Sequence, residues 1–213
     1  MRIEERRWVA GDLEIRAAAD RNLLVGYAAK FGVRSQNLGG FVEKIAPKAF
    51  NRTLSHGGDV VAVRDHDQSR LLGRLSAGTL RLELDDVGLR YEVDLPDTTE
   101  GRDTAELLAR GDLIGSSFKF RPVADEWDET ESGYPERTLT EVELFDVGPV
   151  TFPAYPDAEA SLRSLADARS LDLADLVSAA AQDDLRSLIL PTVDQVQPAV
   201  EAPVPVFHRS WRR

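Results

Sequence analysis

The alternation of apolar and polar residues on both sides of one short turn constrains the fold of this chain more than any other feature. The apolar positions are Leu80, Leu82 and Leu84 before the turn, and Leu89, Tyr91, Val93 and Leu95 after it. Between them, residues 85–88 read Asp-Asp-Val-Gly, a composition typical of turns. A period of two is the pattern of a strand with one buried face, so this segment predicts an antiparallel β-hairpin.

The rest of the first 157 residues also favours strands. Three more strands are expected, at residues 60–63, 114–121 and 139–147. One helix interrupts them: Thr98 or Thr99 can cap its start, it runs to about Arg110, and Gly111 suits the left-handed residue that follows a helix. Many strands with one or two helices predict a mostly β domain over residues 1–157, with a closed or nearly closed β-barrel as its core.

The composition changes after residue 157. Residues 158–190 are rich in Ala, Leu, Asp and Arg, and their large apolar residues have helical spacing. These apolar residues are Leu162, Leu165, Leu185, Leu188 and Ile189. Residues 191–213 contain Pro191, Pro198, Pro203 and Pro205 and few large apolar groups. We therefore expect a helical extension over residues 158–190, followed by a disordered tail.

Composition argues against several classes of function. The 213 residues include no cysteine, so disulfides, thiolate metal sites and a cysteine nucleophile are excluded, and a cytosolic setting is expected. A net charge of -11 argues against nonspecific nucleic-acid binding, which depends on Lys and Arg. No apolar run approaches the roughly 20 residues of a membrane helix. The charged residues 1–7 do not resemble a secretory signal.

Histidine is rare enough for each copy to be weighed. Of the three, His208 lies in the expected tail, and His56 precedes two glycines in an expected exposed turn. His66 directly follows the strand expected at residues 60–63, and a strand end is a place where a rigid scaffold can hold a catalytic base. A lone histidine is more often an ordinary surface residue, so both readings stay open for His66.

Ser117 lies in the sequence Gly-Ser-Ser-Phe-Lys-Phe, within the strand expected at residues 114–121. Small hydroxyl residues in strands are mostly structural. The segment is not a nucleophile elbow, because Lys119 stands where that motif has its second glycine. His66 also precedes the serine, against the chain order of that hydrolase class. Both observations argue against a lipase-like esterase.

Asp146 shares the strand phase of Val142 and Leu144, both apolar. A carboxylate on an apolar phase is costly unless a neighbouring group donates hydrogen bonds to it. The donor is either a structural partner, such as an arginine or a backbone amide, or the ring of His66. Ser117, His66 and Asp146 together would supply a nucleophile, a base and an orienting acid, the minimum for acyl transfer.

Short segments spread over residues 20–160 resemble those of a known family. In chain order they are Val25–Gly32, Glu43–Phe50, His66–Asp67 with Leu72–Arg74, Leu95–Thr98 with Gly101–Asp103, Arg110–Leu113 with Ser117–Phe120, and Val147 with Thr151–Ala154. Their order and spacing are similar to those of the caudoviral prohead proteases, which share a barrel fold with the herpesvirus assemblins. Because the segments are collinear, the resemblance is more specific than any single motif.

The resemblance implies the roles of three residues. The family's base, the histidine before a Leu-Gly-Arg segment, falls on His66. Its nucleophile falls on Ser117 rather than Ser116. An acid just before the Val-Thr-Phe-Pro-Ala segment is the third member, which falls on Asp146, with Glu143 as the substitute.

Three positions depart from the family's pattern. Lys48 and Lys119 stand where glycine is usual, and Asp146 stands where glutamate is frequent. Since aspartate is one methylene shorter, the backbone has to make up the difference. Backbone amides near Ser117, or the guanidinium of Arg121, are the candidates for holding the oxyanion.

The resemblance also implies a setting and partners. It implies a serine endopeptidase that acts in the host cytoplasm, inside the assembling prohead. Its substrates would be the scaffold portion of the major capsid protein, and the protease itself. No metal or organic cofactor is needed, and neither a membrane nor a specific nucleic acid is an expected partner. A homo-oligomer stays open.

Two other functions stay open. A non-catalytic capsid scaffold or capsid-binding module on the same fold would leave processing unchanged in Ser117→Ala. A small-molecule esterase would use the same three residues in a wide pocket. The basic, aromatic end of the tail, residues 207–213, is either an inert flexible end or a tether to scaffold or capsid. In the second case we expect self-cleavage between residues 157 and 200.

Overall fold

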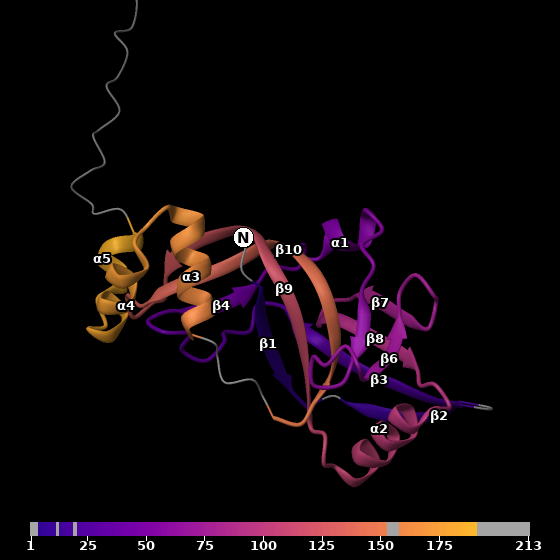
Figure 1. Ribbon diagram of the computed structural model, residues 1–213. Helices are drawn as coiled ribbons and strands as arrows, with labels where there is room; N and C mark the ends of the chain where they lie inside the picture. The colour runs from indigo at the N-terminus through magenta and orange to yellow at the C-terminus, as the bar shows by residue number, and fades with distance from the viewer. Residues whose placement is uncertain (1–3, 12, 19–20, 153–157, 191–213) are drawn as a thin grey trace, which may run out of the picture.

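Two β-sheets pack against each other in the computed structural model, which describes residues 4–11, 13–18, 21–152 and 158–190 (Figure 1). The first sheet has the spatial order β1 (Glu5–Ala10), β9 (Gly115–Glu129), β10 (Pro135–Val150), β5 (Val61–Val63) and β6 (Leu71–Arg74), and β4 (Val42–Ile45) also pairs with β10. The second has the order β2 (Glu14–Ala18), β3 (Arg21–Lys30), β8 (Gly88–Asp94) and β7 (Leu80–Leu84).

The strands expected from the sequence are present. β7 and β8 form the expected antiparallel hairpin, with Leu80 opposite Val93 and Leu82 opposite Tyr91. β9 and β10 run well beyond residues 114–121 and 139–147, because they pair with each other as one long antiparallel hairpin. The far half of β9 alternates half-buried with exposed residues, so it lacks the apolar repeat that marks the buried half.

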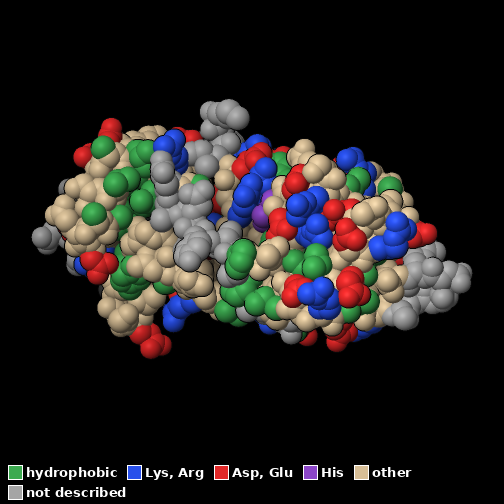
Figure 2. All heavy atoms as spheres, turned by 60° about the horizontal axis from the view of Figure 1, so that its bottom comes forward, with side chains coloured by type: hydrophobic (Ala, Val, Ile, Leu, Met, Phe, Trp, Pro, Cys, Tyr) green, Lys and Arg blue, Asp and Glu red, His purple; other side chains and the backbone are tan. Residues whose placement is uncertain are grey.

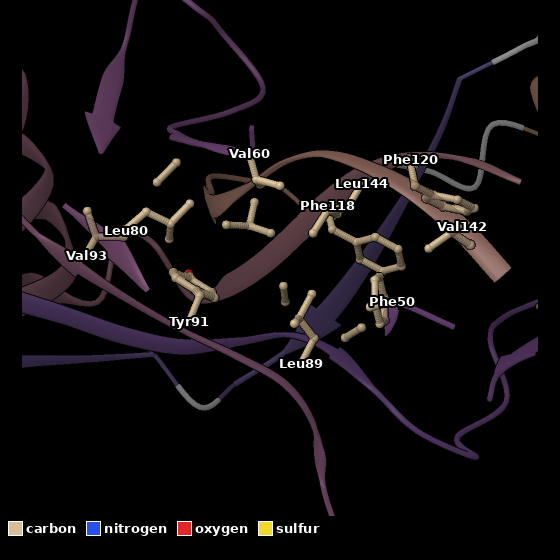
Figure 3. Packing of buried hydrophobic residues seen from close by; sticks show 14 of the residues in the cluster. Phe50, Val60, Leu80, Leu89, Tyr91, Val93, Phe118, Phe120, Val142 and Leu144 are labelled. Atoms are coloured by element: carbon tan, nitrogen blue, oxygen red, sulfur yellow. The ribbon is translucent and has the colours of Figure 1, made fainter. Parts of the chain in front are cut away.

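The mostly β class is confirmed. Of the closed or nearly closed barrel expected for its core, the closed form is wrong. Over the described residues the hydrogen-bonded ladders form two separate sheets, with β1 and β6 at the ends of one and β2 and β7 at the ends of the other. The sheets meet through side chains instead: Tyr91 and Leu89 of one sheet and Phe118 of the other belong to one buried apolar cluster (Figure 3). Apolar periodicity shows that a strand has a buried face, but not which strand lies beside it, so it does not separate a barrel from two packed sheets.

The first domain also contains two helices. α2 (Thr99–Arg110) begins at Thr98, whose hydroxyl oxygen accepts a hydrogen bond from the amide of Gly101 at 3.2 Å. It ends at Gly111, which has a φ of 79°. This N-cap and this glycine are two of the features the sequence predicts. The second helix, α1 (Asn51–Ser55), is a single short turn that we did not predict.

Three helices follow the strands: α3 (Ala158–Arg169), α4 (Leu173–Ala181) and α5 (Leu185–Ile189). They bury a second apolar cluster, which includes Leu162, Leu165, Leu176, Leu185 and Ile189. Leu38 and Phe41 from the segment before β4 complete it, and the Phe41 ring lies 5.0 Å from that of Trp127 on β9. The helical extension therefore packs on the β domain. Leu188, another of the apolar residues with helical spacing, is exposed.

The expected domain boundary at residue 157 and the expected disordered tail, residues 191–213, lie outside the described residues. Among the described helices, none combines the length and the apolar character that crossing a membrane requires. On the face shown in Figure 2, acidic and basic side chains lie intermingled over much of the surface.

Candidate active site

Neighbouring serines on β9 point to opposite faces of the first sheet. Ser116 lies on the core side, where its hydroxyl is 2.9 Å from that of Tyr91. Burial raises the pKa of Tyr91, so this phenol stays protonated. Ser117 lies on the other face, beside β1 and β10, because successive side chains of a strand alternate. Ser117, the predicted nucleophile, and Ser116 therefore differ in the face of the sheet to which their hydroxyls point.

His66 reaches Ser117 from the end of β5. It has a φ of 58° and the preceding Asp65 a φ of 54°, a left-handed conformation that non-glycine residues seldom adopt. Asp65 fixes this turn to the end of β10: its amide donates to the carbonyl of Pro149 at 3.0 Å, and its carboxylate accepts from the amide of Thr151 at 2.7 Å. Such strain persists only where the surroundings impose it, and it is common at functional sites.

Gly148 allows β5 to come close enough for this contact. It lies opposite Ser117 in the β9–β10 pair. A Cβ atom at this position would lie 2.0 Å from the carbonyl oxygen of Val63, the last residue of β5. Any side chain here would push β5 away, and with it His66, which follows β5.

A β-bulge aims Asp146 at the same site. Leu144 lies opposite Phe120, but the next pair is Asp146 opposite Lys119, so one residue of β10 is left over between them. The bulge moves Asp146 off the apolar face of Leu144 and onto the face of Ser117, because it reverses the alternation. The shared phase of Asp146 with Val142 and Leu144 is therefore wrong. The expected need for a donor is met by His66.

The three side chains form one continuous hydrogen-bonded chain. His66 Nδ1 lies 2.6 Å from Asp146 Oδ1, and His66 Nε2 lies 2.7 Å from Ser117 Oγ. A carboxylate oxygen only accepts, so Nδ1 carries a hydrogen and Nε2 of the neutral ring is free to accept one. Ser117 is fully buried, and the side chains of His66 and Asp146 are only 6% and 4% exposed.

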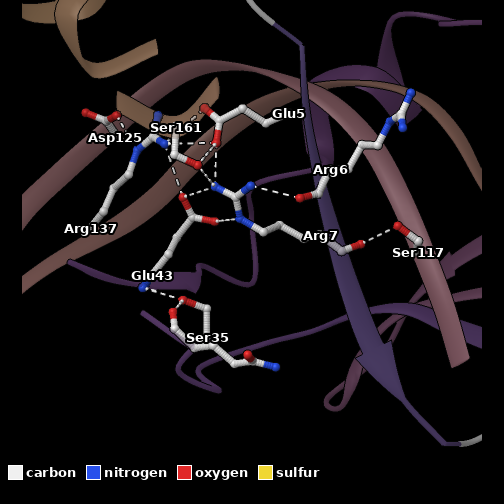
Figure 4. Close-up of polar contacts among 10 residues, drawn as sticks. Glu5, Arg6, Arg7, Ser35, Glu43, Ser117, Asp125, Arg137 and Ser161 are labelled. Atoms are coloured by element: carbon white, nitrogen blue, oxygen red, sulfur yellow. Dashed lines mark hydrogen bonds and ion pairs between the residues drawn. The ribbon is translucent and has the colours of Figure 1, made fainter. Parts of the chain in front are cut away.

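Ser117 has a second polar neighbour that the sequence did not indicate. Its hydroxyl oxygen lies 2.8 Å from the main-chain carbonyl oxygen of Arg7 on β1, which can accept the hydroxyl hydrogen in place of His66 Nε2 (Figure 4). The side chain of Arg7 lies in a buried ion cluster. Main-chain contacts between residues this far apart in sequence leave no mark in composition or spacing.

The other expected site residues lie elsewhere. Glu143, the substitute acid, accepts from Arg121 at 2.8 Å, and the Arg121 guanidinium also lies over the ring of Phe145. No contact described for Arg121 joins it to Ser117 or His66, so its oxyanion role remains a prediction.

His56 lies at the end of α1, where its Nδ1 is 3.0 Å from the hydroxyl of Ser55. Within the described part of the chain, no group of three or more His, Asp or Glu residues is arranged to hold a metal ion.

A serine, a histidine and an aspartate in this arrangement are those of serine hydrolases, which use them for acyl transfer. The family model of the caudovirus prohead serine proteases matches residues 11–171, and this chain belongs to that family. The match includes all three residues of the site and leaves out β1.

A solved structure supports the same fold. The bacteriophage T4 capsid assembly protease is similar with a TM-score of 0.52 at 12% sequence identity, over 71% of this chain and 98% of that one. At this identity the similarity establishes the fold alone. No curated protein matches the sequence.

Proposed function

We propose that this chain is a serine endopeptidase with Ser117 as nucleophile, His66 as base and Asp146 as the orienting acid. In the proposed reaction, Ser117 Oγ attacks the scissile carbonyl carbon while its proton passes to His66 Nε2. The proton then goes to the leaving amine as the peptide bond breaks. Water, activated by the same histidine, hydrolyses the acyl-enzyme and restores the serine.

One observation carries this proposal: the hydrogen-bonded chain from Asp146 through His66 to Ser117, with both contacts below 2.8 Å. A satisfied core histidine needs only partners for its two nitrogens. Here one partner is a buried carboxylate and the other a serine, and the turn that holds the ring is strained. Charge stabilisation of the imidazolium by Asp146 follows from its 2.6 Å contact.

For substrates, we propose the scaffold portion of the major capsid protein and the protease itself, inside the assembling prohead. Family membership supports this proposal. The tailed-phage relative of known structure is described as a capsid assembly protease. Self-cleavage between residues 157 and 200 would release the tail.

Co-expression with the phage's own major capsid protein tests the proposal. Wild type should trim the capsid protein, and intact-mass measurement should show a shortened protease. Ser117→Ala should leave both full length, whereas Ser116→Ala, on the other face of the same strand, should still process. If Ser117→Ala processes normally, the assignment is wrong.

The burial of Ser117 is the one observation that favours the rival, a non-catalytic capsid-binding module. A nucleophile without solvent contact cannot meet a protein substrate until something moves. The rival predicts that Ser117→Ala supports assembly as well as wild type does. The two functions therefore differ in whether the segment that covers Ser117 can move away.

A further inference from the structure

Strand β1 lies directly against the nucleophile. Trp8 is opposite Ser117 and Arg7 is opposite Phe118 in the antiparallel β1–β9 pair. The carbonyl oxygen of Arg7 accepts the hydrogen bond of the Ser117 hydroxyl at 2.8 Å (Figure 4). A main-chain carbonyl from a neighbouring strand thus lies against the oxygen that would attack a substrate.

This contact competes with catalysis. The hydroxyl of Ser117 has a single hydrogen, and its two acceptors are His66 Nε2 at 2.7 Å and the Arg7 carbonyl at 2.8 Å. Proton transfer to the base requires the hydrogen to point at Nε2. While the hydrogen points at Arg7, it cannot be transferred to the base. Full burial of Ser117 excludes substrate in the same state.

We propose that the edge of β9 filled by β1 is the binding site for an extended substrate peptide, and that β1 holds this site until the peptide replaces it. This inference rests on the proposed function. The peptide pairs with β9 as an added strand, and its scissile carbonyl takes the place of the Arg7 carbonyl. The main-chain N–H groups of β9 that β1 covers become donors to the peptide and to the oxyanion.

The position of β1 suits a strand that can leave. It is the end strand of its sheet, so its departure breaks one ladder only. Residues Arg6–Val9 line a cavity of about 310 Å³, so β1 is not closely packed on that side. In the described part of the chain, the buried indole N–H of Trp8 has no hydrogen-bond partner, so the departure of β1 costs this side chain no hydrogen bond. The family match also begins after β1.

The side chain of Arg7 keeps β1 in place meanwhile. Arg7 Nε donates to Glu43 at 2.7 Å, and Glu5, also on β1, accepts from Arg137 at 3.1 Å. Ser161 of α3 lies 3.3 Å from Arg7 Nη2, so the helical extension shares in the anchor. The free energy lost when charges are removed from water offsets much of their mutual attraction. Such a cluster can therefore hold a strand in place and still allow it to leave.

A reversible crosslink tests the proposal. Arg6 and Lys119 lie opposite each other in the β1–β9 pair, and opposite residues have Cβ atoms about 4.5–5.5 Å apart, within a small shift of disulfide geometry. Because the chain has no cysteine, Arg6→Cys with Lys119→Cys can form only this disulfide within one chain. The readout is the rate at which a fluorophosphonate reagent modifies Ser117, followed by intact mass, together with cleavage of the co-purified capsid protein.

The oxidised double variant should be modified at least tenfold more slowly than the reduced one and should not cleave, and reduction should restore both. Each single-cysteine variant should behave alike in both states. Equal rates with and without the crosslink would overturn the proposal while leaving the triad intact. Cleavage of the capsid protein by Ser117→Ala would instead overturn the proposed function.

A second variant tests the anchor without a crosslink. Glu5→Gln weakens the hold on β1 and should raise the fluorophosphonate rate severalfold. Glu4→Gln, the exposed neighbour, whose carboxylate pairs with Lys119, should leave the rate unchanged. A rate for Glu5→Gln equal to that of Glu4→Gln would contradict the anchoring role.

Discussion

Two buried polar clusters meet at Arg7, one on its main chain and the other on its side chain (Figure 4). The first is the chain of Asp146, His66 and Ser117. The second joins Arg7 and Arg137 to three carboxylates, Glu5, Glu43 and Asp125. The first is assembled by unusual backbone, namely a left-handed turn, a bulge and a glycine. The second lies on regular strands and is assembled by charge compensation.

The difference teaches which property each cluster controls. The unusual backbone fixes the direction of a few side chains, so losing one side chain of the proposed triad should remove the proposed chemistry but leave the fold. Charge compensation depends on every member, because removing one leaves an opposite charge buried and unpaired. Substitutions in the first cluster should therefore change rate and leave stability nearly unchanged. Those in the second should change stability, and should change rate only through the hold on β1.

The largest expected effect is on rate. Ser117→Ala and His66→Ala should each lower processing by roughly 10⁴–10⁶, since members of such a unit act together. The free energy of unfolding should change little. Capsid-protein trimming and urea denaturation of the same preparations measure both. A triad variant that unfolds readily while retaining activity would contradict the assignment of rate to the first cluster and of stability to the second.

Asp146→Asn should lower the rate by about 10⁴, the magnitude known for loss of the orienting carboxylate. The neutral amide can donate a hydrogen bond to Nδ1 as well as accept one, so it no longer fixes the tautomer of the ring. The imidazolium also loses its counterion. Glu143→Gln is the matched control, because Glu143 pairs with Arg121 instead. A larger loss in Glu143→Gln would reassign the acid.

Arg137→Met tests the second cluster. The side chain of Arg137 is fully buried and contacts Glu5, Glu43 and Asp125. Its removal should cost about 3–5 kcal/mol of unfolding free energy, because these carboxylates lose a common partner. Arg52→Ala, which removes an exposed pair with Glu141, should have no measurable effect. Denaturant titration of both variants checks the contrast.

The smallest expected effect is the pH dependence of stability contributed by Glu5. Burial alone would raise the pKa of Glu5, but the charges of Arg7 and Arg137 outweigh it and hold the pKa below its ordinary value of 4.5. A lowered pKa means that the contribution is complete above pH 4.5 and is lost as pH falls through the folded-state pKa. Unfolding free energies at several pH values should show wild type losing more stability in acid than Glu5→Gln. Parallel losses would contradict this role for Glu5.

The sequence predicted local elements well because their causes are local. The β7–β8 hairpin follows from apolar alternation around residues 85–88, and α2 follows from Thr98 and Gly111. The roles predicted for Ser117 and His66 came from a resemblance to a family, because a serine in a strand and a histidine after a strand are ordinary on their own.

What could not be predicted depends on contacts between distant segments. Simple alternation places Asp146 on the same face as Leu144, and the bulge before Asp146 moves it to the other face. One extra residue in a strand leaves no signal in composition, so the sequence does not reveal the bulge. Glu5 and Arg7 look like the polar face of an exposed strand until Glu43 and Arg137 enclose them. The Arg7 carbonyl has no side-chain signal at all, so the cover over Ser117 is visible only in three dimensions.

The close approach at Gly148 bears on how other sequences of this kind are judged. A chain can retain the serine, the histidine and the aspartate and still be inert if a bulkier residue follows at this position, since its first carbon would collide with the carbonyl of Val63. Loss of the glycine would thus be a marker of a degenerate copy that the three proposed catalytic residues alone would not reveal. Screening genomes for active members should therefore weigh four positions, the fourth of which has no functional group.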